Sequence, residues 1–351
     1  MKRQKLYYPL LALWALAAVL SSCESDDPVN PIKPREERTI LLISSEGHIY
    51  DQTGKKIKEL PNCEEANEII SDGDDYFVSG KTTKDRVGYW KNGKWNTLHV
   101  DFIEDVEHWT DGIGKWDYYI FLFDYPNILR NSGIFPLEDC ADFVPASKCM
   151  SVSEGRCYVV GRDHPDDDNM HQNALLYSEQ KGRYAKTILP KLREDVNAAA
   201  FAVFAHDRTH TVIGGRHGED PCLWVDGQLQ ILPRLFDTHD KTGEGMAVAY
   251  VNSVTYSNGH IYAVGSDNEE DGRETSMLWI DGVPYRLESD QEGLYWSWAT
   301  EVISYGDDWY ALSLEMYDAP GDDYGLSILV WLNGEVYRKY HGIDIVNFTV
   351  L

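Results

Sequence analysis

Short runs of alternating apolar and polar residues recur along the chain, separated by turns that contain glycine. One such run, AYVNSVTY at 249–256, is followed by a Ser-Asn-Gly turn and then by HIYAVG at 260–265. Alternation with a period of two places the apolar side chains on one face of a β-strand. The pattern therefore predicts an all-β chain of short antiparallel strands joined by tight turns.

One kind of turn is repeated almost exactly. A tryptophan, a spacer, Asn or Asp, and then Gly occur as WKNG at 90–93, WVDG at 224–227, WIDG at 279–282 and WLNG at 331–334. Asn-Gly and Asp-Gly supply the two residues with positive φ that a two-residue type I′ hairpin needs. We expect each tryptophan to be a strand residue that packs between neighbouring repeats.

With looser copies of this turn included, the repeat is a unit of four antiparallel strands in roughly 45 residues, which is typical of a β-propeller blade. Six complete units are expected at approximately 66–100, 103–140, 146–190, 196–233, 247–288 and 298–340. The remaining strands lie at 39–60 and 343–351, and together they supply a further blade that joins the two ends of the sequence. The sequence therefore predicts a seven-bladed β-propeller over 39–351.

The first 22 residues have the composition of an export signal. A basic start, MKRQK, precedes an apolar run at 10–20 that is too short to cross a bilayer. The segment LSSC at 20–23 resembles the bacterial lipobox, and this resemblance implies that Cys23 is lipidated and becomes the mature N-terminus. Residues 23–38 are polar and rich in proline, which predicts a flexible tether.

Two further resemblances bear on where the protein is found. The acidic cluster Glu24, Asp26 and Asp27 resembles the signal that sends Bacteroidetes lipoproteins to the outer face of the outer membrane. The repeat at 37–351 resembles that of propeller lipoproteins from Bacteroidales. These resemblances imply an outer-membrane lipoprotein exposed at the cell surface.

The net charge limits the partners. It is −26 for the whole chain, and removal of the signal, with Lys2, Arg3 and Lys5, takes it to −29. Such a chain repels phosphate backbones, so nucleic acid is not an expected partner.

The cysteines do not predict a zinc site, because none forms a CxxC pair. With Cys23 lipidated, an odd number remains, so at least one thiol is free and the disulfide pairing stays open. These residues are Cys63, Cys140, Cys149, Cys157 and Cys222.

The longest and most irregular connections fall between the second and third strands of a unit and between successive units. In a propeller these B–C and D–A loops share one face, which here is strongly acidic, and variable loops on a rigid scaffold are common binding sites. One interpretation is Ca²⁺ binding, because Asp166, Asp168, Asp267 and Asp271 offer closely spaced carboxylates. The alternative is a solvated acidic loop, and His164, His171 and His217 are likewise expected to be solvated.

A second interpretation is glycan binding. Trp296 and Trp298 alternate, so they share one face of an extended segment beside Tyr295, and Asn252 could add a hydrogen bond. The alternative is packing between blades.

A third interpretation is catalysis in the central funnel, where the innermost strands begin. Paired carboxylates there could act on glycosides, but no G-x-S-x-G or H-E-x-x-H motif is present. The candidates for the funnel are Asn67, Glu68, Glu104, Glu107, His108, Lys148, Asn197, Asn252, Glu301 and Asp344.

Together these features favour a non-catalytic surface lipoprotein that binds a glycan, or an outer-membrane protein partner, through the acidic loop face. Besides the three aromatic residues, the predicted ligand-binding residues are Asn252, Glu301, Glu107 and His108. The alternative is a propeller enzyme that acts on a polysaccharide.

Overall fold

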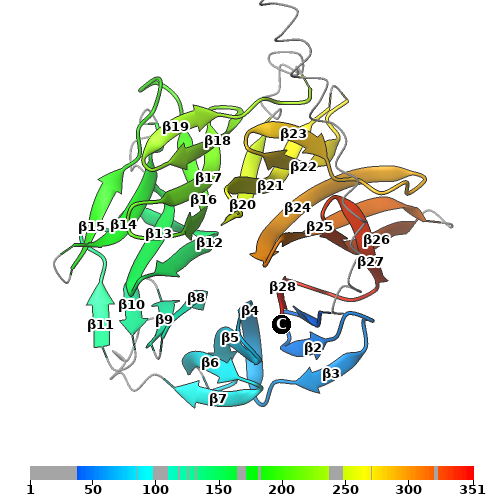
Figure 1. Cartoon of the computed structure of the whole chain (residues 1–351), viewed down its shortest axis with the longest axis horizontal. Coiled ribbons are helices and arrows are strands. Elements are labelled where there is room, and N and C mark those ends of the chain that lie inside the picture. Colours follow the sequence, from blue (N-terminus) through cyan, green and yellow to red (C-terminus); the bar gives the residue numbers. More distant parts are fainter. Residues whose placement is uncertain are drawn as a thin grey trace, which may run out of the picture. The chain divides into compact units, whose positions relative to one another are not determined.

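The computed structural model describes residues 38–351 except 85, 98–109, 118, 125, 131–132, 164–170, 181–182, 237–247, 270 and 320–322. Residues Thr39–Leu351 form one compact unit. Its sheets surround a common centre, with one strand of each four-stranded sheet innermost (Figure 1). The described residues contain strands and no helix, and hence no helix able to span a membrane. The fold is all-β and propeller-like, as predicted.

Five sheets have four antiparallel strands each, named here from the innermost strand outward. They are β28 (Asn347–Val350) with β1 (Ile40–Ile43), β2 (His48–Tyr50) and β3 (Lys56–Glu59); β4 (Cys63–Asp72) with β5 (Asp75–Thr82), β6 (Val87–Lys91) and β7 (Lys94–Thr97); β8 (Thr110–Trp116) with β9 (Tyr119–Asp124), β10 (Asn127–Arg130) and β11 (Gly133–Pro136); β20 (Tyr250–Ser257) with β21 (His260–Asn268), β22 (Glu274–Ile280) and β23 (Val283–Arg286); and β24 (Leu294–Tyr305) with β25 (Asp308–Ala319), β26 (Asp323–Leu332) and β27 (Glu335–His341).

The remaining sheet has eight strands. Its two inner strands, β12 and β16, are joined by a single parallel bridge between Lys148 and Ala202. The structure thus has five sheets of the predicted blade type and one larger sheet, and not seven separate sheets. The eight strands are β12 (Phe143–Ser153), β13 (Arg156–Asp163), β14 (Ala174–Gln180), β15 (Arg183–Ile188), β16 (Ala198–Ala205), β17 (Thr211–His217), β18 (Asp220–Val225) and β19 (Gln228–Ile231).

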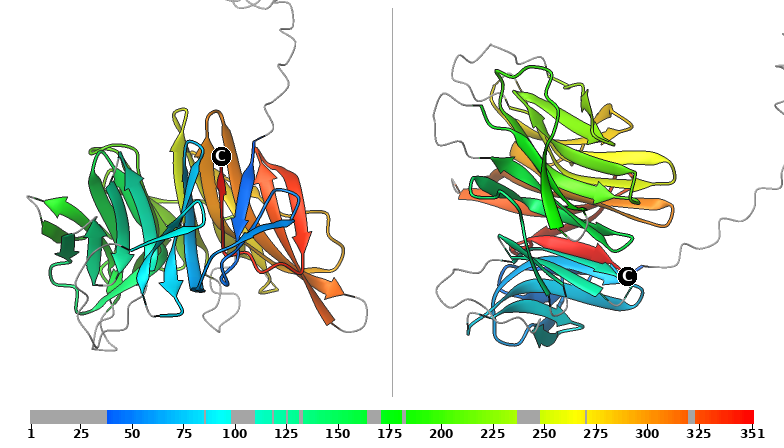
Figure 2. Two further views of the ribbon diagram at one scale, coloured as in Figure 1. Left: turned by 90° about the horizontal axis from the view of Figure 1, so that it is seen from below. Right: turned by 90° about the vertical axis from the view of Figure 1, so that its left-hand side faces the viewer.

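The two ends of the described chain are joined in one sheet, as predicted. Strand β28 pairs antiparallel with β1, from Ile40 opposite Val350 to Ile43 opposite Asn347. Figure 2 shows this C-terminal strand, in red, beside the N-terminal strands, in blue. Because β28 is the innermost strand of its sheet, this pairing closes the ring of sheets.

The tryptophan turns have the predicted conformation and role. In each, the Asn or Asp and the following Gly both have positive φ, as at Asp226 (50°) and Gly227 (76°). Trp90, Trp224 and Trp279 are completely buried. Each indole N–H also donates to a proline carbonyl in the connection just before its own sheet or run of strands, at Pro61, Pro190 and Pro233. The tryptophans therefore tie neighbouring strand groups together.

The inner strands carry a repeated β-bulge that the sequence analysis did not predict. In β16, Ala200 pairs with Gly215 and Ala202 with Gly214, so Phe201 is an extra residue. Register shifts also follow Ala66, Pro145 and Val251, and the residues opposite these three are Gly80, Gly161 and Gly265. The shifts after Ala66 and Val251 add one residue, whereas the shift after Pro145 places residues 146–149 opposite Val160. A Cβ atom on any of the four glycines would overlap a carbonyl oxygen of the inner strand. These four bulges therefore leave no room for a side chain on the neighbouring strand, whereas the register shifts in β24 and β8 face Ser313 and Asp124.

Substitution Gly215→Ala tests this steric constraint. The new Cβ would meet the carbonyl oxygen of Ala199, which is backbone and cannot turn aside. We expect a loss of about 3 kcal/mol or more in the free energy of unfolding, measured by urea denaturation. The control Gly227→Ala, whose Cβ would meet nothing within 4 Å, should cost only about 1–2 kcal/mol, from its positive φ. Equal losses in the two variants would contradict the explanation.

Candidate functional site

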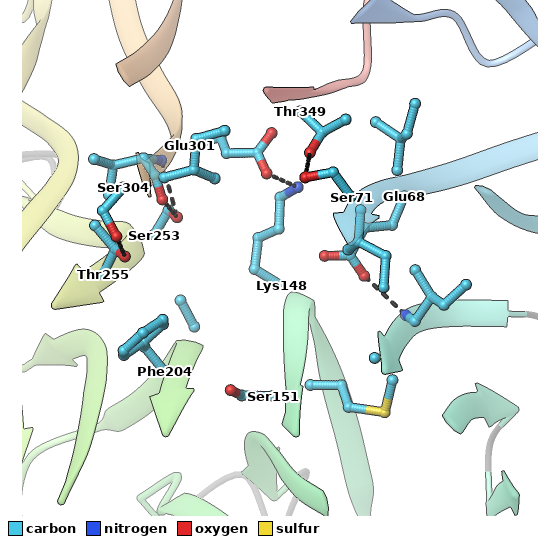
Figure 3. Close-up of a pocket in the computed structure, with 18 of the residues that line it drawn as sticks. Glu68, Ser71, Lys148, Ser151, Phe204, Ser253, Thr255, Glu301, Ser304 and Thr349 are labelled. Carbon is cyan, nitrogen blue, oxygen red and sulfur yellow. Dashed lines mark hydrogen bonds and ion pairs between the residues drawn. The ribbon is translucent and has the colours of Figure 1, made fainter. Parts of the chain in front are cut away.

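A cavity of about 380 Å³ lies at the centre of the ring of sheets. Its walls come from the innermost strand of every four-stranded sheet and from both inner strands of the eight-stranded sheet (Figure 3). No residue of the described B–C or D–A loops lines it. The lining extends instead toward the ends of the inner strands that lead into the A–B turns, where Ser71, Lys115 and Tyr305 stand.

Three charged side chains from three different sheets meet in this cavity. The Lys148 Nζ lies 2.9 Å from Glu301 Oε1, which is ion-pair distance, although the angle is poor for a hydrogen bond. Glu68 Oε2 accepts a hydrogen bond of 2.9 Å from the Ile113 backbone N–H. Glu301 is almost fully buried, whereas the side chain of Glu68 is partly exposed. Both residues line the cavity. The cluster therefore combines one cation with two carboxyl groups in a confined space.

The electrostatics of the cluster favour a proton on Glu68. Burial raises the pKa of Glu68 from 4.5 to about 7, against the opposing effect of Lys148 and the Ile113 N–H, and the Glu301 carboxylate raises it further. Burial also raises the pKa of Glu301, although Lys148 opposes this. Near neutral pH, Glu68 can therefore donate or accept a proton.

Hydroxyl groups line the other part of the cavity. Thr349 Oγ1 donates to Ser71 Oγ (3.0 Å), and Ser71 Oγ donates to the Val350 carbonyl (2.8 Å). Thr255 and Ser304 share a hydrogen bond of 3.0 Å. Each bond joins the inner strands of neighbouring sheets. The hydroxyls thus stabilise the ring and leave lone pairs that can accept hydrogen bonds from a ligand.

Two of the predicted ligand residues have different roles in the structure. Glu301 lies in the cavity, as predicted for the funnel. Asn252, in contrast, is the bulged residue of β20, and its Nδ2 donates to the Ala299 carbonyl at 2.9 Å. Its amide therefore helps to hold β24 against β20.

The predicted aromatic residues lie at the start of β24, outside the cavity lining. The rings of Tyr295 and Trp296 are 4.7 Å apart, and the Tyr295 ring is 6.1 Å from that of Tyr324. These three side chains are 46%, 38% and 68% exposed. Trp298 is partly buried. We call Tyr295, Trp296 and Tyr324 the aromatic shelf.

The two described metal candidates are not brought together as a metal site. Asp267 is completely buried, and its carboxylate accepts hydrogen bonds from the guanidinium of Arg234 and the backbone amides of Leu235 and Asn268. Asp271 is exposed and accepts the backbone N–H of Arg273 within its turn. No three metal-binding side chains are grouped among the residues that the structure describes. The expectation for Asp267 is therefore corrected: it is a structural ion-pair residue.

Several predicted residues lie outside the described part of the chain. They are Cys23, Glu104, Glu107, His108, His164, Asp166 and Asp168.

The five cysteines after Cys23 are all free thiols. Cys149, Cys157 and Cys222 are completely buried within the hydrophobic clusters between sheets. Burial raises the pKa of the Cys157 and Cys222 thiols, so these residues act as small apolar side chains.

Comparisons with known proteins do not identify a family. No protein-family model matches the chain, and no curated protein sequence matches it. Among solved structures, the chain is similar to a puromycin-hydrolyzing peptidase from Mycobacterium tuberculosis (13% identity, TM-score 0.47), over 79% of this chain and 43% of that one. It is also similar to a xylan β-1,4-xylosidase from Bacillus halodurans (13% identity, TM-score 0.36), over 79% and 56% respectively.

A third similar structure is the extracellular domain of a hybrid two-component system from B. thetaiotaomicron. The identity is 11% and the TM-score 0.47, over 88% of this chain and 46% of that one. The chain thus spans about half the length of these three proteins. Because their TM-scores are below 0.5, no argument about activity rests on them.

The raised pKa of Glu68 predicts a pH-dependent stability. Glu68 binds its proton more tightly in the folded protein than in the unfolded chain, so its contribution is present below about pH 4.5 and is lost as the pH rises through about 7. Between pH 5 and pH 8 the free energy of unfolding should therefore fall by an amount on the order of 3 kcal/mol from this group. Glu68→Gln should remove that part of the decrease in urea denaturation at a series of pH values.

The control for this experiment is Glu292→Gln at an exposed loop position, which should keep the wild-type pH profile. An unchanged pH profile in Glu68→Gln would show that Glu68 titrates at its ordinary pKa.

Proposed function

We propose that this protein is a seven-bladed propeller that binds a small hydroxyl-rich ligand, such as the end of a glycan, in its central cavity. The observation that carries the proposal is the cluster of Glu68, Lys148 and Glu301 in a central cavity of about 380 Å³. That volume is near the lower end of the roughly 300–1,000 Å³ typical of small-molecule sites. It suits one or two sugar rings better than an extended chain.

The count of seven blades rests on the strand order of the eight-stranded sheet. From one edge to the other it runs β15-β14-β13-β12 and then β16-β17-β18-β19. This order is two runs of four strands that meet at their inner strands, so we count the sheet as two blades.

The chemistry of the lining supports a hydroxyl-rich ligand. A sugar hydroxyl can donate to a carboxylate and accept from an ammonium group, and Glu68 and Lys148 offer both within one cluster. The apolar lining residues, among them Ile113, Met150 and Phe204, can cover the C–H faces of a sugar ring. A strongly charged ligand would be a poorer match, because the Lys148–Glu301 pair already neutralises itself.

The cellular setting remains the one inferred from the sequence. We propose that lipidation of Cys23 anchors the protein to the outer membrane and that the tether at 23–38 holds the propeller at the cell surface. Acyl chains contribute ~0.8 kcal/mol per buried CH₂, so several chains give stable anchoring.

Isothermal calorimetric titration of the purified protein with a panel of mono- and oligosaccharides tests the ligand proposal. We expect Glu68→Gln and Lys148→Met to weaken binding at least tenfold, because both side chains face the cavity. The matched control is Trp296→Ala on the aromatic shelf, which should bind as the wild type does. If only Trp296→Ala lost binding, the glycan would sit on the loop face and the cavity proposal would be wrong. Absence of binding to every sugar would also overturn it.

A second candidate function is hydrolysis of a glycoside in the same cavity. The observation that favours it is the raised pKa of Glu68, about 7, next to a second carboxyl group, that of Glu301. Glycosidases use a carboxylic acid with a raised pKa together with a second carboxylate. The same titration separates the two functions. A binding protein returns the sugar unchanged, whereas an enzyme releases new reducing ends, and Glu68→Gln would abolish that release.

A further inference from the structure

A second cavity, of about 570 Å³, lies away from the centre, beside the run β16–β19. Its walls come from the connection between β15 and β16, at 192–197, and from the end of β17, the short turn after it and the start of β18, at 216–220. The lining residues include His171, Arg193, Asp195, Arg216, His217 and Glu219. Unlike the central cavity, this one is built from B–C and D–A loops.

Arg216 is the unusual residue of this cavity. Its Nε is buried and makes no hydrogen bond with any residue that the structure describes, while the rest of the side chain is partly exposed. No carboxylate among the described residues forms an ion pair with it. Arg193, in the same cavity, differs: its guanidinium is held by Asp195 through two contacts, of 3.0 and 2.6 Å. Arg216 therefore retains its capacity to donate hydrogen bonds.

The charges near Arg216 do not compensate its burial. Burial lowers the pKa of Arg216, the neighbouring guanidinium of Arg162 lowers it further, and Tyr250 opposes these two effects. Arg162 and Arg216 occupy the same repeat position, each directly after the glycine that faces a bulge in the inner strand. The repeat thus places two arginines of neighbouring four-strand runs close enough to repel each other. In a chain with a net charge of −26, a cation with no ion-pair partner among the described residues needs an explanation.

The neighbouring histidine does not provide that partner. His217 is buried, and its Nε2 accepts a hydrogen bond of 3.2 Å from the Leu192 backbone N–H. Burial lowers the pKa of His217, so the ring is neutral near pH 7. Its accepting nitrogen is already used, which removes His217 as a metal ligand and leaves Arg216 as the charged donor.

We propose that this cavity binds an oxyanion, the carboxylate or phosphate group of a small ligand, through the guanidinium of Arg216. A guanidinium matches the two oxygens of such a group with two parallel hydrogen bonds. An anion in the cavity would also relieve the repulsion between Arg162 and Arg216. The site is distinct from the central cavity in position, in lining and in the charge of the ligand it selects.

Calorimetric titration of the purified protein with inorganic phosphate and with glucuronate tests the proposal, with glucose as the uncharged probe. We expect the wild type to bind at least one of the two anions and not glucose in this cavity, and Arg216→Gln to weaken that binding at least tenfold. Phosphate and glucuronate distinguish the two kinds of oxyanion. Arg183→Gln is the matched control, because this exposed arginine is paired with Glu138 and does not line the cavity, and the affinity of this variant should stay within twofold of the wild type.

Two results would overturn the proposal. One is that neither anion binds, and the other is that Arg216→Gln binds as tightly as the wild type. A second measurement detects a purely structural role: without anion, the urea midpoint of Arg216→Gln should be no lower than that of the wild type, since no protein partner is lost. A lower midpoint would show that Arg216 has a carboxylate partner within the protein. Glu68→Gln should leave anion binding unchanged, so the two cavities are tested independently.

Discussion

The bulge in the inner strands is the constraint on which the rest of the structure depends. An extra residue in one strand of an antiparallel pair re-aims the side chains around it. Glu68 and Lys148 lie inside such bulges, in β4 and β12, and Glu301 follows directly after the one in β24. The three charged residues of the central cavity are therefore all positioned by the same local irregularity, repeated in sheets far apart in the sequence.

On the side that faces the axis, the inner strands have backbone N–H and C=O groups that no neighbouring strand pairs with. Polar side chains from the inner strands of other sheets form hydrogen bonds with some of these groups. Glu68 accepts the Ile113 N–H, and Glu301 lies within 3.4 Å of the Phe348 nitrogen. The two glutamates are thus explained in part by the fold alone. Lys148 also has a structural reason, because an apolar side chain in its place would leave the buried Glu301 carboxylate without a counter-ion. Its Nζ nevertheless makes no hydrogen bond with a described residue, and this unused donor capacity supports the proposed ligand.

The sequence predicted what depends on local spacing. Period-two alternation and the Asn-Gly and Asp-Gly pairs located the strands and turns, and the buried role of Trp224 followed from its place before the turn. The bulges were missed because a shift of register is visible only when two strands are aligned in space. Asp267 was misassigned for a similar reason: its partner, Arg234, is 33 residues earlier and carries no local signal. Glu68 and Glu301 could be named as funnel residues, but their meeting with Lys148 depends on closure of the whole ring.

The two cavities divide the chemistry of the molecule in a way that follows from the repeat. The residue opposite the start of the bulge is glycine in four strands, and the next residue along is Lys81, Arg162, Arg216 or Ser266. The bulges in β4 and β12 thus supply Glu68 and Lys148 to the central cavity, whereas the bulged Asn252 holds β24 against β20. The residue after the glycine can vary without disturbing the bulge. Substitution at this position can therefore introduce a cation near the acidic loop face of a propeller while Glu68 and Glu301 stay in place in the central cavity. On this argument, the charge at Arg216 is a property of the site and not a requirement of the fold.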